Sequence, residues 1–148
     1  MSWRELAAGS PELAEFGKKR FASEVAYIAT IKKDGAPRVH PVTPIVGDEG
    51  LFLFMEPTSP KGRDLRRDGR YALHCSVADS SGEGGEFLLT GRARFVKDED
   101  TRAIAVQHAS YEPADRYILF ELLIDTAFST VYNAYGNPIR NHWRRSTG

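Results

Sequence analysis

Residues 59–70 read Ser-Pro-Lys-Gly-Arg-Asp-Leu-Arg-Arg-Asp-Gly-Arg; they follow three short apolar runs and open a short helix. Ser59 is a favourable N-cap, because its hydroxyl can accept an N–H of the first turn. Pro60 suits the first helical position, where no N–H is needed. Lys61 and Arg63 place cations beside a helix N-terminus that already favours anions. The stretch therefore indicates either an ordinary capped surface helix or a binding site for a phosphate group.

Short runs rich in β-branched and aromatic residues flank this helix and predict antiparallel strands. Asp34-Gly35 supplies a hairpin turn, and Gly91 inside a long run indicates a bend or a bulge. Many short strands with few helices predict a mainly β, α+β fold, a small antiparallel barrel or sandwich, in one domain covering 1–148. The expected strands are 25–31, 37–46, 51–55, 71–77, 86–96, 117–124 and 128–135. The expected helices are an N-terminal helix within 1–22, which includes a helix start at Ser10 and runs to about Phe21, the helix after Ser59, and 98–108. A C-terminal tail spans 136–148.

The expected second strand carries three prolines, Pro37, Pro41 and Pro44. Proline cannot donate to a strand ladder, so it belongs at edges, bulges or strand ends. Such a strand leaves backbone groups that a ligand could use. An irregular edge strand without a ligand is the equally simple alternative.

Composition excludes several classes of function. Lys plus Arg and Asp plus Glu number 20 each, so the net charge is zero and there is no global attraction to nucleic acid or an anionic membrane. Cys75 is the one cysteine, which fits a reducing compartment and favours a buried, inert thiol. The chain shows no signal-peptide pattern and no membrane-span pattern, and its histidines lack metal-ligand spacing. We therefore expect a cytoplasmic protein without a metal, a nucleic-acid partner or a membrane partner.

Several of these parts, in this order, resemble the pyridoxamine phosphate oxidase-like FMN-binding split-barrel family. The resemblance covers roughly 25–131 and is closest to the general-stress and flavin or deazaflavin oxidoreductase branches. Arg140-Asn-His142 has the spacing of the family's C-terminal substrate motif by letters only, so no pyridoxal phosphate role is assigned to it. The matching stretches are Ala29-Thr-Ile31, Asp34-Gly-Ala-Pro-Arg-Val39, His40-Pro-Val-Thr-Pro44, Ser59-x-Lys61, the run Asp64-Leu-Arg-Arg-Asp-Gly-Arg-Tyr-Ala-Leu-His74 and Glu86-Phe-Leu-Leu-Thr-Gly-Arg-Ala-Arg94.

The resemblance implies a homodimer of six-stranded antiparallel split β-barrels with short flanking helices and cofactor sites between the subunits. It implies that Ser59 and Lys61 hold the ribityl phosphate of FMN, with Arg38 as a further partner. It also implies that Trp143 reaches the flavin of the other subunit. The residues implied to line the isoalloxazine edge are Arg38, Val39, His40, Pro41 and Val42.

Three functions are compatible with this pattern. The first is an FMN-binding oxidoreductase that transfers a hydride to or from a small organic substrate. The second is a reductase that uses the deazaflavin coenzyme F-420, with Lys61 and Arg63 on its phosphate. The third is a flavin-binding stress or sensing protein without turnover. No side chain is identified as a catalytic acid or base.

Overall fold

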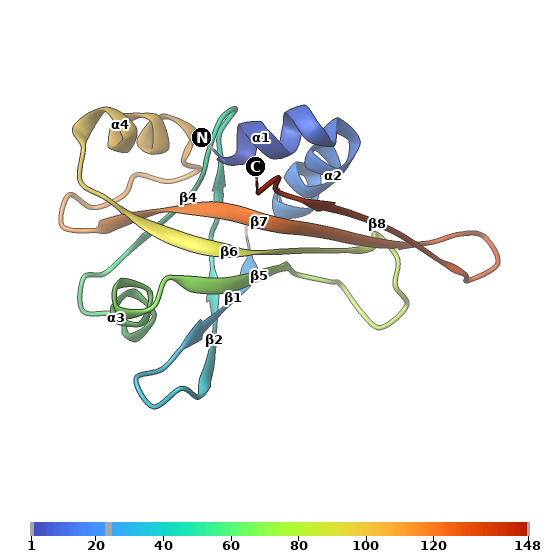
Figure 1. Ribbon diagram of the computed structural model, residues 1–148, viewed down its shortest axis with the longest axis horizontal. Helices are drawn as coiled ribbons and strands as arrows, with labels where there is room; N and C mark the ends of the chain where they lie inside the picture. The colour runs from blue at the N-terminus through green and yellow to red at the C-terminus, as the bar shows by residue number, and fades with distance from the viewer. Residues whose placement is uncertain (1, 23–24, 148) are drawn as a thin grey trace.

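The computed structural model describes residues 2–22 and 25–147, which form four helices and eight strands (Figure 1). All the strand pairs are antiparallel, which confirms the mainly β, α+β class. The helices are α1 (Ser2–Gly9), α2 (Pro11–Phe21), α3 (Pro60–Arg67) and α4 (Glu99–His108). The strands are β1 (Ala26–Ile31), β2 (Pro37–Val42), β3 (Ile45–Val46), β4 (Leu51–Met55), β5 (Arg70–Cys75), β6 (Glu86–Val96), β7 (Ile118–Tyr132) and β8 (Pro138–Arg144).

The strands form one sheet whose two ends are joined by a very short piece of chain. The order is β2-β1-β5-β6-β7-β4-β3, with β8 added beside β7. Only Thr43 and Pro44 separate β2 from β3, so Val42 and Ile45 lie at most about 11 Å apart. Within the described residues, no strand pairing joins β2 to β3. The sheet therefore curls into a barrel that is split along this seam.

The predicted count of six strands is wrong, because the structure has eight. The expected strand 37–46 divides at Thr43-Pro44 into β2 and the two-residue β3, since proline cannot continue a ladder. The expected tail 136–148 contains β8, which pairs with β7 along its whole length. The two strands expected at 117–124 and 128–135 are one strand, β7.

A bulge bends the two longest strands. Thr90 pairs with Thr126 and Gly91 with Ile124, so Asp125 is an extra residue on β7. A Cβ at Gly91 would lie 1.9 Å from the carbonyl oxygen of Leu123, a distance that excludes any side chain there. The predicted irregularity at Gly91 is confirmed. The bulge bends β7 and increases its twist, and β6 and β7 remain paired on both sides of it.

The helices flank the barrel on two sides (Figure 1). In this view α1, α2 and α4 lie above the long strands, and α3 lies below them beside β1 and β2. The apolar residues of α1 and α2 join the main core, whereas α4 covers a smaller cluster around Phe52 and Phe54. The N-terminal helix expected over 1–22 is two helices, α1 and α2, and Trp3 and Leu6 of α1 are both buried. No described helix has the length and apolar character that crossing a membrane requires.

Candidate anion-binding site on helix α3

The first turn of α3 uses most of its own polar groups. The Ser59 hydroxyl accepts the Gly62 N–H at 3.1 Å, which confirms the predicted N-cap. The Ser59 carbonyl accepts the Arg63 N–H at 3.1 Å, and Pro60 has no N–H. Within the described residues, the Lys61 N–H and the proton of the Ser59 hydroxyl are left for a ligand. The helix N-terminus therefore offers two donors, fewer than the sequence pattern implied.

Lys61 brings a cation to this end of the helix. Its side chain is half-buried and makes no hydrogen bond or ion pair with any other described residue. Burial lowers the pKa of its ammonium group, because desolvation disfavours the charged form. An anion beside Lys61 would stabilise the charged ammonium, which burial disfavours.

Asp64 lies one turn further along α3 and connects three elements. It is 2% exposed, and its Oδ2 accepts hydrogen bonds from Thr30 Oγ1 of β1 at 2.8 Å and from Arg38 Nε of β2 at 2.7 Å. Its Oδ1 accepts one from Arg67 at 3.0 Å. Burial alone would raise the pKa of Asp64, but these three hydrogen bonds outweigh it, and the pKa lies below the usual aspartate value. Asp64 is thus a carboxylate at neutral pH and fixes two guanidinium groups.

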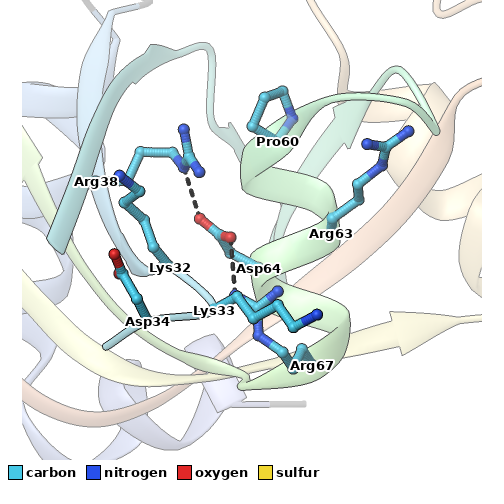
Figure 2. Close-up of a pocket in the computed structure, with 8 residues that line it drawn as sticks. All are labelled: Lys32, Lys33, Asp34, Arg38, Pro60, Arg63, Asp64 and Arg67. Carbon is cyan, nitrogen blue, oxygen red and sulfur yellow. Dashed lines mark hydrogen bonds and ion pairs between the residues drawn. The ribbon is translucent and has the colours of Figure 1, made fainter. Parts of the chain in front are cut away.

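A pocket of about 690 Å³ opens beside this carboxylate (Figure 2). Arg38 reaches Asp64 from β2, and Arg67 reaches it from the far end of α3. Five of the eight lining residues are cationic and two are acidic, so a neutral protein has gathered positive charge at one place. The lining residues are Lys32, Lys33, Asp34, Arg38, Pro60, Arg63, Asp64 and Arg67. We call this set the cationic pocket.

The predicted site residues divide between this pocket and its surroundings. Arg38 and Arg63 line it, whereas Ser59 and Lys61 lie beside it at the start of α3 and are not part of the lining. His40 and Val42 alternate with exposed neighbours and therefore share the face of β2 that carries Arg38. The two other predicted residues, Val39 and Pro41, lie on the opposite, exposed face.

The position of β2 agrees with both readings of its prolines. It pairs with β1 from Pro37 to Val42 and is the last strand of the sheet. One row of its backbone groups consequently has no strand partner within the described residues, as at any sheet edge. The strand is therefore an edge strand, and it carries Arg38.

Trp143 lies in β8, opposite Ala127 of β7, and is half-buried against α1. A Cβ at Gly9 would lie 2.4 Å from the indole Nε1, so the ring occupies the space above that glycine. Trp143 therefore packs within its own subunit. Its predicted contact with the flavin of another subunit stays a prediction.

The sequence interpretation missed the residues that organise the pocket. Asp64, Thr30, Arg67 and the pair Lys32-Lys33 were not singled out. Asp64 is one of two acidic residues among the five cations of 61–70, and its position three residues before Arg67 was the available signal. Thr30 carried no local signal, because its partner is 34 residues away. Among the described residues no group of three or more His, Cys, Asp or Glu could hold a metal ion.

The outer face of the sheet carries a continuous row of side chains that includes no Lys, Arg, Asp or Glu. The registers place Pro41, Tyr27, His74, Leu88, Phe128 and His142 opposite one another in turn across β2, β1, β5, β6, β7 and β8. Paired residues share a face, and six strands span about 24 Å. Tyr27 is 45% exposed and Phe128 41%. We call these six residues the outer row.

The family model described as Pyridoxamine 5'-phosphate oxidase matches residues 10–129, most of the chain. No curated protein matches the chain. The structure is similar to that of PhzG from Burkholderia lata 383 in complex with tetrahydrophenazine-1-carboxylic acid, with a TM-score of 0.67 and 14% identity over 97% of this chain and 87% of that one.

Two further solved structures share the fold. A NimC/NimA family protein from Clostridium acetobutylicum has a TM-score of 0.66 and 15% identity, covering 90% of this chain and 93% of that chain. A heme binding protein from Mycobacterium smegmatis has a TM-score of 0.65 and 19% identity over 88% of this chain. The match covers only 58% of that heme binding protein. Structural similarity at such low sequence identity establishes the fold and leaves the ligand open.

Proposed function

Because this chain belongs to the pyridoxamine 5'-phosphate oxidase family, we propose that it binds FMN and uses it to oxidise or reduce a small organic molecule. The observation that carries the proposal is the anchoring of Arg38. Asp64 holds its Nε at 2.7 Å, and its two Nη groups make no hydrogen bond to any described residue. A guanidinium fixed in this way is pre-organised for a phosphate, because few rotamers remain to be ordered on binding.

The groups at the start of α3 fit the phosphate of FMN. The Ser59 hydroxyl and the Lys61 N–H are donors, and the Lys61 ammonium and the Arg38 guanidinium supply the positive charge. The free edge of β2 fits the flavin ring, since backbone N–H and C=O groups can pair with its polar edge. His40 and Val42 lie on the face of the strand that carries Arg38.

FMN, when bound, supplies the hydride-accepting ring, and the protein supplies position and electrostatics. In this proposal Arg38, Ser59 and Lys61 bind and orient the cofactor, and no side chain is given a proton-transfer role. Asp64 is a positioning residue, because it acts on the cofactor through Arg38.

We also propose that two copies associate through the outer row. None of its six residues is Lys, Arg, Asp or Glu, and Tyr27 and Phe128 expose large apolar surfaces. Tyr27→Glu should convert a dimer to a monomer in light-scattering chromatography. Tyr135→Glu is the matched control, because Tyr135 is 89% exposed in the β7–β8 turn, outside the outer row. Equal masses for the two variants would contradict this interface.

The cofactor is tested by the absorption spectrum of protein purified without added cofactor and by mass spectrometry of what it releases. A released FMN supports the proposal. A released deazaflavin F-420 supports the second reading, and a Soret band would indicate haem. A colourless protein that binds no FMN on titration would overturn the proposal. Turnover of reduced nicotinamide by the loaded protein then separates an enzyme from a non-catalytic flavin-binding protein.

The phosphate contacts are tested by Lys61→Ala and Ser59→Ala. Each removes a donor to a charged group, worth about 1.5–3 kcal/mol, so FMN affinity should fall at least about tenfold. Asp98→Ala is the control for Ser59→Ala, because Asp98 caps α4 by accepting the Thr101 N–H at 2.9 Å. It should loosen a helix end without changing FMN affinity. Unchanged affinity in Lys61→Ala and Ser59→Ala would show that the phosphate binds elsewhere.

A further inference from the structure

The cationic pocket and the start of α3 are different places on the same helix (Figure 2). Pro60, Arg63, Asp64 and Arg67 are spaced three or four positions apart and share one face. Lys61 lies about 60° around the helix from Asp64 and about 110° from the middle of that face. It does not line the pocket. A phosphate held by Ser59 and Lys61 therefore leaves most of the pocket's cations without an anion.

The pocket is built on fixed backbone. Lys32 and Lys33 belong to the hairpin turn between β1 and β2, which closes through the hydrogen bonds Lys32 N–H to Ala36 O at 2.8 Å and Gly35 N–H to Lys32 O at 2.9 Å. Gly35 has a φ of +89°, the left-handed conformation that the turn requires. Arg67 donates to the Ile31 carbonyl at 2.8 Å and so ties α3 to this turn. The two sides of the pocket are joined by Arg67 and by the Asp64 carboxylate.

The charges in the pocket are not balanced. Within the described residues, Lys32, Lys33 and Arg63 have no carboxylate partner, and Arg63 and Arg67 are like charges one helical turn apart, which is unfavourable without an anion. Five arginines outside the pocket have a carboxylate partner among the described residues, as Arg38 and Arg67 have inside it. The pairs outside the pocket are Arg4–Glu49, Arg70–Asp68, Arg94–Glu121, Arg116–Glu56 and Arg145–Asp125.

We infer that the cationic pocket is a second anion site, which takes the diphosphate group of a dinucleotide. Its volume of about 690 Å³ lies in the range of small-molecule sites, about 300–1,000 Å³, and its cations come from three segments of chain. Two linked phosphates present acceptor oxygens over a longer span than one phosphate does, which suits cations that come from separate segments of chain. Arg38 borders both places, so one ligand group on each side of it is compatible with the geometry. The inference rests on the proposed function only in giving the FMN phosphate to Ser59 and Lys61.

Two dinucleotides carry this chemistry. One is a reduced nicotinamide dinucleotide, which would bring the hydride that the proposed function needs. The other is flavin adenine dinucleotide, whose second phosphate would extend past Arg38. The shared diphosphate is what the pocket recognises, and the two sources are separated by experiment.

The first experiment uses inorganic pyrophosphate, with orthophosphate for comparison, in calorimetric titrations of the full chain. Pyrophosphate should bind more tightly than orthophosphate. Lys33→Glu and Arg63→Glu should each weaken pyrophosphate binding at least about tenfold, because each removes a charge-assisted hydrogen bond. Lys19→Glu is the matched control: it changes the net charge equally on an exposed position of α2 and should leave binding within about twofold.

Three results would overturn the inference. The first is equal affinity for pyrophosphate and orthophosphate. The second is equal weakening by Lys19→Glu and by the pocket variants. The third is a tenfold loss of FMN affinity in Lys33→Glu, because the pocket would then belong to the flavin phosphate. A protein that binds pyrophosphate as expected but not FMN would disprove the proposed function and leave the second site standing.

The second experiment identifies the source. Reduced nicotinamide dinucleotide and flavin adenine dinucleotide are each titrated into the wild type, Arg63→Glu and Lys19→Glu. The dinucleotide that displaces pyrophosphate and loses about tenfold in affinity in Arg63→Glu alone is the ligand of the pocket. If neither depends on Arg63, the pocket does not take a dinucleotide and the inference is wrong.

Discussion

Asp64 on α3 and Glu121 on β7 are both buried carboxylates paired with arginine, yet their surroundings differ. Both oxygens of Asp64 accept hydrogen bonds, from Thr30, Arg38 and Arg67. Glu121 accepts two hydrogen bonds from Arg94, both on its Oε1. Its Oε2 is buried without a partner among the described residues. Asp64 joins three elements, whereas Glu121 joins two neighbouring strands at opposite register positions.

The spaces beside the two carboxylates differ as well. The pocket beside Asp64 has five cations against two carboxylates. The depression beside Glu121 is mixed, because Arg145 there is paired with Asp125 and Arg94 compensates Glu121. Burial of a carboxylate is therefore not enough to indicate a site. What distinguishes Asp64 is that its partners keep donors free on the side of a pocket with excess positive charge.

The strongest test of this comparison is Asp64→Ala. It leaves two guanidinium groups without their shared carboxylate, and breaking a buried pair costs about 3–5 kcal/mol. We expect about 3 kcal/mol less free energy of unfolding in urea, because Arg38 and Arg67 keep partial access to water. FMN affinity should fall too, since Arg38 loses its anchor. If the variant is as stable as the wild type, the Asp64 carboxylate does not stabilise the contact between α3, β1 and β2.

Glu121→Gln tests the other member of the pair. Arg94 is 41% exposed and stays solvated, so the loss should be about 1.5 kcal/mol, that of one hydrogen bond to a charged group. FMN and pyrophosphate affinities should not change, because Glu121 lies outside both proposed sites. A loss of FMN affinity as large as that of Asp64→Ala would show that the comparison separates the two carboxylates wrongly.

Acid provides the smallest and most selective effect. The pKa of Asp64 lies below its value in the unfolded chain, about 3.9. Its carboxylate therefore contributes stability in full above that value and loses it as pH falls through the folded-state pKa. The difference in unfolding free energy between the wild type and Asp64→Asn should be constant well above about pH 3.9 and narrow as the pH falls below that value. A difference that stays constant below that value would mean that the charge of Asp64 does not contribute.

Features set by neighbouring residues were predictable from the sequence. The cap at Ser59, the Asp34-Gly35 turn and the bulge at Gly91 each follow from a local conformational requirement. The family resemblance at 25–131 is confirmed by the match over 10–129. A helical N-terminus was predicted, but its division into the separate helices Ser2–Gly9 and Pro11–Phe21 was not.

Features set by distant residues were not predictable in this way. The Asp64 network joins residues 26 and 34 positions away. Strand β8 has charged and polar residues and no clear alternation, and its pairing partner β7 defines it. The union of the two expected strands into β7 depends on the extra residue Asp125, which a single strand pattern cannot show. Register and burial are properties of the assembled sheet.

The seam at Thr43-Pro44 has a mechanical consequence. The barrel is closed there by two covalently linked residues and by the packing of Val42 and Val46 on the core, and within the described residues no ladder hydrogen bond crosses it. Widening the seam breaks no inter-strand hydrogen bond, whereas separating any other neighbouring strands does. Since the free edge of β2 forms one lip of this seam, motion of the barrel wall there is opposed by apolar packing and chain connectivity and not by a strand ladder.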